Sequence, residues 1–402
     1  MANPLIEVQK HGQSIWYDNI RRGLISSGEL YHMVQNDGLL GITSNPAIFK
    51  AAVVGNSDYD QAIKALVLQG AGSALEMYEH LAIEDIQWAA DVLHSVYDRT
   101  SGRDGYVSLE VSPYLANDTK GTVEEARRLH REVGRENVLI KIPATPAGVP
   151  AIEQAISDGI SINVTLLFSV EAYQAVALAY MAGLEKYAAR GGDISKVASV
   201  ASFFVSRIDT LVDDKLDKLL AETQDAARQQ ELHSLQGKVA IANAKIAYAK
   251  YEELIASDRW KALVAKGART QRLLWASTST KNPKYPKTLY VDELIGSDTV
   301  NTIPAETFVA FREHGTVRSA LTENWTTNLQ QAKDTMSLLA KVGISMKEVT
   351  DALLVDAVKK FCDPFDQLLA ALDAKRQQLA VAKAPAPAPA ARPAKATAAA
   401  GS

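Results

Sequence analysis

Short apolar runs alternate with longer stretches of helical character between residue 1 and about residue 375. Most of the eight short runs are too apolar for a strand with one solvent-facing side, which would alternate apolar and polar residues. Strands buried on both faces are typical of a parallel sheet covered by helices, so the pattern predicts repeated βα units. The predicted strands are Ser14–Asp18, Leu39–Thr43, Tyr106–Val111, Val138–Ile142, Ile160–Val164, Val197–Ser202, Arg272–Ala276 and Thr299–Ile303.

The segments between these strands predict helices. One runs from Thr122 to Val133 and opens with a Thr-x-x-Glu capping box from Thr122 to Glu125. Another runs from Ser169 to Tyr187. Two longer inserts, residues 56–104 and 205–268, each have room for two or more helices, which we interpret as decorations rather than extra domains.

Eight strands with helical crossovers fit a (β/α)8 TIM barrel with extra helices inserted in the loops, although an open doubly wound sheet has the same count. Polar residues recur at the carboxyl ends of the predicted strands. These ends converge from all directions only in a closed barrel, so the pattern favours the barrel and predicts an active site at that face. The polar residues are Asp18, Thr43, Glu110, Lys141, Asn163, Ser202, Ser277 and Asn301.

The C-terminal part of the chain differs in composition from the rest. From Ala382 to Ala400, 15 of 19 residues are Ala or Pro. Such a segment cannot bury enough apolar surface to fold, and alternating Ala-Pro favours an extended spacer. We therefore expect one barrel domain over residues 1–375 and an Ala/Pro-rich disordered tail or linker over residues 376–402.

Charge and composition exclude several classes of function. The 402 residues carry 43 basic and 47 acidic side chains, a net charge of −4, which argues against general nucleic-acid binding. No run approaches the roughly 18 apolar residues of a membrane span, and the first residues lack a signal-peptide core, so we expect a cytoplasmic protein with no membrane partner. Cys362 has no second cysteine to pair with, and the histidines show no paired ligand spacing, so we expect no metal and no cofactor.

Lys141 is the least expected residue, because it stands inside the apolar run Val138–Pro143. Burial disfavours the ammonium form and lowers the pKa of a lysine, and a neutral amine can attack a ketone to give a Schiff base. The alternative is a structural lysine that reaches solvent or pairs with Glu110. Glu110 and Asp18 are candidates for the proton transfers that such a mechanism needs, although carboxylates are more often salt-bridge or cap residues.

Further polar residues suggest contacts with a substrate. Two Asn-containing turns after the second and fifth strands place amides and hydroxyls where they can bind a polyol, although the same residues are common in turns and caps. Hydroxyl and cationic residues after strands six and seven suggest a phosphate clamp, since phosphate sites of such barrels lie nearby; the alternative is ordinary exposed polar residues. The two groups are Thr43, Asn45, Asn163 and Thr165, and Arg207, Ser277 and Lys281.

Six segments in order along the chain closely resemble the transaldolase family, and the resemblance covers nearly all of residues 1 to 375. The segments are Gly41–Phe49, Val107–Val111, Leu139–Ala144, Ile162–Phe168, Ala201–Arg207 and Leu274–Asn282. The resemblance implies a metal-independent class I mechanism in the pentose phosphate pathway. Lys141 would attack the carbonyl of fructose 6-phosphate or sedoheptulose 7-phosphate, release an aldose phosphate, and pass the remaining dihydroxyacetone unit to erythrose 4-phosphate or glyceraldehyde 3-phosphate.

The resemblance also implies roles for single residues. Asp18 would be the base of the cleavage step, and Glu110 would act as acid and base through a water held by Thr165. The remaining residues would bind substrate: Thr43, Asn45, Asn163 and Ser202 the dihydroxyacetone moiety, and Arg207 and Ser277 the phosphate.

The chain departs from the family pattern in its phosphate loop. Many members carry an arginine two positions after the strand-seven serine, whereas this chain has Ser279 there and its nearest cation is Lys281. Lysine lacks the bidentate fork of arginine, so phosphate binding is expected to differ. The length resembles an extended subgroup that is sometimes fused to glucose-6-phosphate isomerase, and such a fused domain in the native chain would suit the Ala/Pro linker.

Two other functions fit the same residues. An aldolase of the fructose-6-phosphate type would use the same lysine but release free dihydroxyacetone, and the difference depends on water exclusion and proton supply. A catalytically silent protein would keep the barrel and the phosphate clamp to bind sugar phosphates, with an inert, charged Lys141.

Overall fold

The computed structural model describes residues 3–383, and its eight strands form a closed parallel barrel in the order β1 to β8. The predicted (β/α)8 barrel with additional helices is therefore confirmed, and the open sheet is excluded. The strands are β1 (Gln13–Tyr17), β2 (Gly41–Ile42), β3 (Tyr106–Glu110), β4 (Val138–Pro143), β5 (Ile162–Leu167), β6 (Ser199–Phe204), β7 (Gln271–Ala276) and β8 (Thr299–Ile303).

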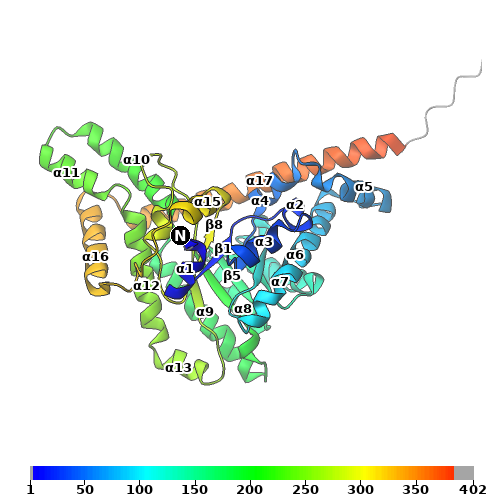
Figure 1. The fold of residues 1–402 in the computed structure, drawn as a ribbon, viewed down its shortest axis with the longest axis horizontal. Helices are drawn as coiled ribbons and strands as arrows, with labels where there is room; N and C mark the ends of the chain where they lie inside the picture. The colour runs from blue at the N-terminus through cyan, green and yellow to red at the C-terminus, as the bar shows by residue number, and fades with distance from the viewer. Residues whose placement is uncertain (1–2, 384–402) are drawn as a thin grey trace, which may run out of the picture.

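Helices surround the barrel on its outside (Figure 1). The α-helices are α1 (Pro4–Glu7), α2 (Arg22–Ser26), α3 (Glu29–Asn36), α4 (Pro46–Val53), α5 (Asp60–Gln69), α6 (Ala74–Arg99), α7 (Thr119–Val133), α8 (Gly148–Ser157), α9 (Val170–Ala189), α10 (Ser206–Glu222), α11 (Ala226–Leu235), α12 (Val239–Ile255), α13 (Asp258–Val264), α14 (Leu289–Asp292), α15 (Ala305–His314), α16 (Trp325–Lys341) and α17 (Met346–Lys383). Short 3-10 helices are η1 (Val8–His11), η2 (Ser57–Tyr59), η3 (Pro113–Leu115) and η4 (Ile194–Lys196). No helix between residues 3 and 383 is both long and apolar enough to cross a membrane.

Three strands begin later than predicted, β2 at Gly41, β5 at Ile162 and β6 at Ser199. The N–H of Ile160 donates to the last turn of α8, and the N–H of Val197 donates to η4. These bonds commit the N–H groups of both residues to preceding helical turns instead of to a neighbouring strand, although the β-branched side chains favour a strand. The local hydrogen bonds therefore decide where β5 and β6 begin.

The predicted capping box from Thr122 to Glu125 is wrong. Helix α7 begins at Thr119, and the carboxylate of Asp118 caps it by accepting an N–H of its first turn. Glu125 instead accepts the N–H of Ser112 in the preceding loop. The second predicted helix is confirmed as α9, with Ser169 as its N-cap. Both inserts are helical as predicted, with η2, α5 and α6 in the first and α10 to α13 in the second.

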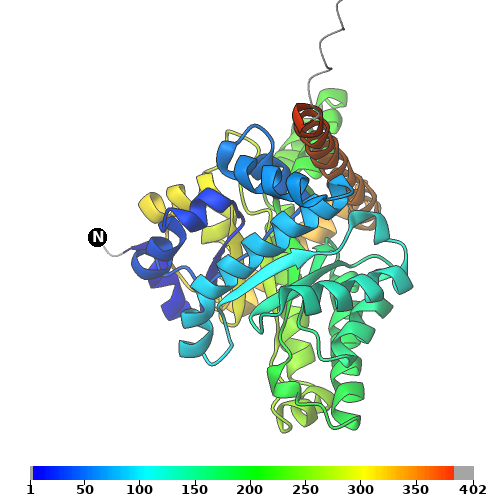
Figure 2. The same ribbon diagram turned by 90° about the vertical axis from the view of Figure 1, so that its right-hand side faces the viewer.

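The long helix α17 lies at the carboxyl end of the barrel (Figures 1 and 2). It contacts α4, η3 and α10, which are the first helices after β2, β3 and β6. It also contacts α5 and α6 of the first insert. The helix continues past residue 375 to Lys383, while residues 384–402, which hold most of the Ala/Pro-rich segment, lie outside the described part of the chain. The division into a barrel domain and a separate tail stays a prediction.

Candidate active site

Glu110, Lys141 and Asn163 occupy facing positions on β3, β4 and β5. Residues in register on neighbouring parallel strands project to the same side of the sheet, so the carboxylate, the amine and the amide lie next to one another. All three side chains are buried: Glu110 is the last residue of β3, Lys141 lies in the second half of β4, and Asn163 is the second residue of β5. Sequence positions far apart are thus brought together by strand register alone.

Lys141 is only 4% exposed, so a lysine that reaches solvent is excluded. Its Nζ lies 3.6 Å from Oε2 of Glu110 and donates a hydrogen bond to the carbonyl of Ser44 at 3.0 Å. The ring centroid of Phe361, on α17, lies 6.0 Å from the same Nζ. The amine therefore sits between one carboxylate and one aromatic ring, largely away from bulk water.

The two carboxylates near Lys141 are shifted toward their protonated forms. Burial raises the pKa of Glu110 to about 7, although the charge of Lys141 opposes the shift. Burial also raises the pKa of Asp18, against the charge of Lys141 and a 2.6 Å hydrogen bond from Thr43 Oγ1 to Asp18 Oδ1. Carboxyl groups that gain and lose protons near neutral pH suit general acid–base catalysis.

A cavity of about 140 Å³ opens next to the amine. Eight of the eleven predicted site residues line it: Asp18, Thr43, Asn45, Lys141, Ser202, Arg207, Ser277 and Lys281. The other three do not line it. Glu110 reaches the site through Lys141, and Asn163 reaches it through Ser202, whose Oγ donates to Asn163 Oδ1 at 2.7 Å.

Thr165 is fully buried, and its Oγ1 has no hydrogen-bond partner among the described residues; the same is true of Glu110 Oε2. The strand is irregular here, because the pairing of β5 with β6 changes register between Val164 and Leu167. Leu166, inside that bulge, has a φ of 61°. Bulges and left-handed non-glycine residues cost energy and concentrate at functional sites.

Two cations lie on the other side of the cavity. Arg207 is held over the ring of Phe204, with 5.2 Å from Cζ to the ring centroid, and its buried Nη1 has no partner within residues 3–383. Burial lowers the pKa of Arg207. Lys281 is exposed, and its Nζ donates to Ser279 Oγ at 2.8 Å. Ser277 also lines the cavity, in a left-handed conformation with a φ of 56°.

Asn45 combines two functions. Its Oδ1 accepts the N–H of Ile48 and so caps α4, which is the turn role that its sequence context Asn-Pro also predicts. Its side chain nevertheless lines the cavity, and the cap leaves the amide NH2 available. A residue can therefore be structural and still present a polar group to a substrate.

Sequence reasoning did not predict six of the residues that line the cavity, and three of them are informative. Thr302, and not the predicted Asn301, is the residue of β8 that lines the cavity. Thr302 Oγ1 lies 2.6 Å from Thr43 Oγ1, whereas Asn301 Oδ1 accepts a hydrogen bond from Thr278. Successive strand residues point to opposite sides, so an error of one position changes the side. Phe204, two residues after Ser202, was within reach of the same alternation. Phe361 gave no local signal, because it joins the site only through the position of α17.

Other features of the molecule lie elsewhere. A cavity of about 750 Å³ between α12 and α16 contains none of the predicted site residues. Among residues 3–383, no group of three or more His, Cys, Asp or Glu side chains is arranged to hold a metal ion. The chemistry-bearing groups thus gather at one place, the carboxyl end of the barrel.

A closed parallel barrel with a buried lysine on its fourth strand, and with carboxylates after the first strand and at the end of the third, has the arrangement of a barrel enzyme. The sequence profile of the transaldolase/fructose-6-phosphate aldolase family matches residues 15–372. A transaldolase of Trichodesmium erythraeum is 50% identical over 381 residues, which cover 94% of this chain and 99% of that protein. Transaldolase 2 of a Nostoc species is 50% identical over 376 residues, covering 93% and 97%. A transaldolase of Thermobifida fusca is 45% identical over 380 residues, covering 94% and 99%.

The chain belongs to the transaldolase/fructose-6-phosphate aldolase family. Its similarity to relatives named transaldolase, over nearly their whole length, supports the transfer of ketol groups between sugar phosphates as its activity. The resemblance seen in the six sequence segments is confirmed.

Proposed function

We propose that Lys141 carries the transfer as a Schiff base. Its Nζ attacks the keto carbon of fructose 6-phosphate or sedoheptulose 7-phosphate, and loss of water from the carbinolamine leaves a protonated imine. Glu110, 3.6 Å from Nζ, supplies and removes the protons of these steps through a water held by Thr165. The unpartnered buried oxygens of Glu110 and Thr165 support this assignment.

Carbon–carbon cleavage follows on the imine. Asp18 takes the proton of the hydroxyl on C4, the far carbon of the C3–C4 bond that breaks. That oxygen becomes the carbonyl of the leaving aldose, and the electron pair of the C3–C4 bond moves into the imine to give an enamine. An aldose phosphate leaves. The enamine carbon then attacks the aldehyde of erythrose 4-phosphate or glyceraldehyde 3-phosphate, Asp18 returns its proton, and hydrolysis frees Lys141. The location of Asp18 and Lys141 in one cavity supports this sequence of steps.

Substrate binding is divided between the two sides of the cavity. Thr43, Asn45 and Ser202, the last oriented by Asn163, are placed for hydroxyl groups of the dihydroxyacetone unit. Arg207, Ser277 and Lys281 are placed for the phosphate. Because Phe361 packs beside the amine and is 5% exposed, it helps to keep water from the enamine, which favours transfer over release.

The observation that carries the proposal is a buried amine paired with a carboxylate and facing a sugar-sized cavity. The test is borohydride reduction in the presence of fructose 6-phosphate, followed by intact mass and peptide mapping. We expect a covalent adduct on Lys141 in the wild type and none in Lys141→Met. An adduct on another residue, or binding without trapping, overturns the proposal; the latter result would support the catalytically silent sugar-phosphate protein.

Lys245 provides a matched control. It is another buried lysine, burial lowers its pKa, and it lies 3.8 Å from the carboxylate of Glu293 on the outside of the barrel. Lys245→Met should trap the substrate as the wild type does. If Lys245→Met lost the adduct, Lys245 rather than Lys141 would be implicated in trapping, and the proposal would be overturned.

The family also contains aldolases that release dihydroxyacetone. The two activities separate when glyceraldehyde 3-phosphate release from fructose 6-phosphate is measured with and without erythrose 4-phosphate. Transfer predicts turnover that depends on the acceptor, and full turnover without acceptor would assign the chain to the aldolases. A cytoplasmic location in the pentose phosphate pathway, and a fused isomerase domain in the native chain, are further predictions of the family resemblance.

A further inference from the structure

A second polar cavity lies at the amino end of the barrel, opposite the active site. It has a volume of about 280 Å³ and is formed by the loop before β3, the start of β6 and the segment that leads into β7. Three arginines line it, Arg103, Arg269 and Arg272, and no carboxylate of the described residues does. A cavity with this lining favours an anion.

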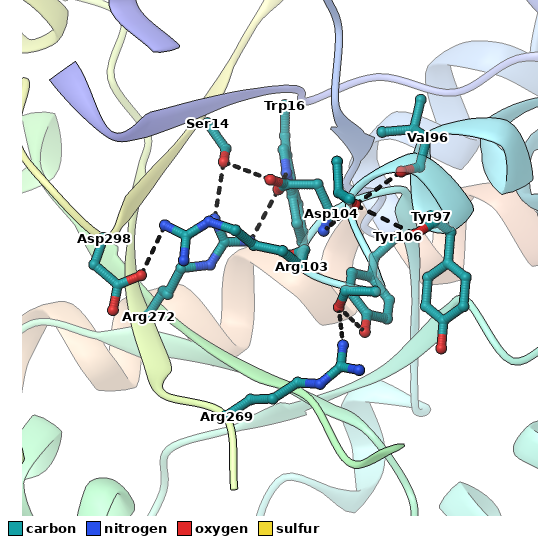
Figure 3. A network of polar contacts seen from close by, with 12 residues as sticks. Ser14, Trp16, Val96, Tyr97, Arg103, Asp104, Tyr106, Arg269, Arg272 and Asp298 are labelled. Carbon is teal, nitrogen blue, oxygen red and sulfur yellow. Dashed lines mark hydrogen bonds and ion pairs between the residues drawn. The ribbon is translucent and has the colours of Figure 1, made fainter. Parts of the chain in front are cut away.

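One of the three arginines is fully engaged. Arg272 is 4% exposed and donates to Ser14 Oγ at 2.8 Å and to Asp104 Oδ1 at 2.9 Å. Asp104 also accepts hydrogen bonds from Ser14 and from Trp16 Nε1, as Figure 3 shows. Arg272 and Asp104 therefore satisfy each other, and neither leaves a free charge.

The second arginine also has a partner. Arg103 Nη2 lies 2.8 Å from Asp298 Oδ1, and Asp298 accepts a further hydrogen bond from Thr270 at 2.7 Å. Both carboxylates of this region are thus committed to the first two arginines and to neutral donors.

Arg269 is different, because it forms no ion pair with any described carboxylate. In Figure 3 it lies apart from Asp104, near Tyr106, and donates to the carbonyl of Gly102. A Cβ on Gly102 would collide with this guanidinium, so glycine allows the close approach. The three arginines thus have only two carboxylate partners, Asp104 and Asp298, and the positive charge without a partner is that of Arg269. Most of the five N–H donors of Arg269 are unused within the described residues.

We propose that this cavity is a second anion site that binds a phosphate group, either as inorganic phosphate or as a small phosphate ester. The planar fork of Arg269 matches phosphate oxygens, and no described carboxylate lines the cavity to compete for it. The other two arginines are neutralised by Asp298 and Asp104, so the net charge that attracts the anion is that of Arg269. The volume exceeds that of a lone phosphate and leaves space for a short carbon chain. The site is independent of the Schiff-base chemistry at Lys141.

The test is titration calorimetry of the full chain with inorganic phosphate and, separately, with glycerol 3-phosphate, in a chloride buffer of constant ionic strength. Two variants distinguish the two ends of the barrel. Arg269→Gln should weaken one class of sites by about 10- to 100-fold while kcat for sugar transfer stays unchanged. Arg207→Gln should weaken the other class and leave the Arg269 class intact.

The outcomes divide clearly. Binding at the Arg269 site by both probes identifies the phosphate group as the ligand, and tighter binding of glycerol 3-phosphate identifies an ester as its source. Arg269→Lys, which keeps the charge and guards against a folding defect of Arg269→Gln, should retain part of the affinity. The proposal is overturned if all binding is lost in Arg207→Gln or if Arg269→Gln binds both probes as the wild type does.

Discussion

The barrel buries a cation near each end of its strands, Lys141 at the carboxyl end and Arg272 at the amino end, and each has a buried carboxylate beside it. The Arg272–Asp104 pair is closed at 2.9 Å and saturated by neighbouring hydroxyl and indole donors. The Lys141–Glu110 pair is looser, with 3.6 Å between Nζ and Oε2, and this Oε2 accepts no hydrogen bond within the described structure.

The difference between the two pairs shows how a buried ion pair can serve either stability or chemistry. A saturated pair has no hydrogen-bonding capacity left for a ligand, so it acts on stability and on the geometry of the barrel. A loose pair next to a cavity keeps donors, acceptors and shifted pKa values available for a reacting molecule. The same type of residue in the same type of strand is structural at one end and chemical at the other.

The largest expected effect is the loss of activity in Lys141→Met. The variant has no amine to form the covalent intermediate, so transfer should fall to background. Stability should change by no more than about 1 kcal/mol at pH 6, because Glu110, with a pKa of about 7, is already mostly protonated there and leaves no unpaired buried charge when Lys141 is removed. Urea unfolding measures the change in stability, and a transfer assay measures the loss of activity. A variant that is strongly destabilised but still active would show that Lys141 is structural and not chemical.

Arg272→Met should show the opposite behaviour. It leaves Asp104 buried without its cation, so unfolding free energy should fall by about 3–5 kcal/mol, while kcat per folded molecule stays close to the wild-type value. Arg103→Met is the matched control, since that side chain is 48% exposed and its pair should contribute less than about 1 kcal/mol. If both variants lost the same unfolding free energy, the saturated hydrogen bonds of the Arg272–Asp104 pair would not contribute to stability.

The sequence was sufficient for one half of this comparison. Lys141 stood out as a charge in an apolar strand, and the strand ends pointed to the correct face. Arg272 stood in a comparable strand without an assigned role, because its partner Asp104 is distant in sequence and only barrel closure brings them together. The position of Arg272 at the amino end of its strand could have indicated a structural role, since this end of a barrel strand is typically structural.

The remaining errors have the same origin. The starts of β5 and β6 and the cap of α7 were decided by backbone hydrogen bonds to flanking residues, which apolar patterns do not report. Phe361 reached the cavity because α17 packs across helices that follow three different strands. Local patterns predicted the strands, whereas contacts between distant segments needed the fold.

Glu110→Gln tests whether the looser pair is chemically active. Below pH 7 the Glu110 carboxyl is mostly protonated and can supply the proton for loss of water from the carbinolamine, so Schiff-base formation should slow as the pH rises through about 7. The variant should lose about 10²- to 10⁴-fold in rate. Its residual rate should no longer fall as the pH rises through about 7.

The control for this pH profile is Asp18→Asn. This variant also lowers the rate, but its rate should still fall with rising pH. The fall should occur at a lower pH than in the wild type, because the negative charge of Asp18 contributes to the raised pKa of Glu110. Rates of imine formation between about pH 5 and 9 measure both variants. If the rate of Glu110→Gln still fell with pH as in the wild type, the titration would belong to another group.

The smallest effects are expected at Arg207 and Lys281. Arg207 is a half-buried arginine whose buried Nη1 donor is unused within the described structure, in contrast to Arg272. Arg207→Ala should raise KM for phosphorylated donors by about 10- to 100-fold with little change in kcat, because it removes binding shared by substrate and transition state. Lys281→Ala should raise KM less, since Lys281 is an exposed point charge. Neither should alter KM for unphosphorylated dihydroxyacetone, and a fall in kcat alone would show that Arg207 acts on the chemistry rather than on phosphate binding.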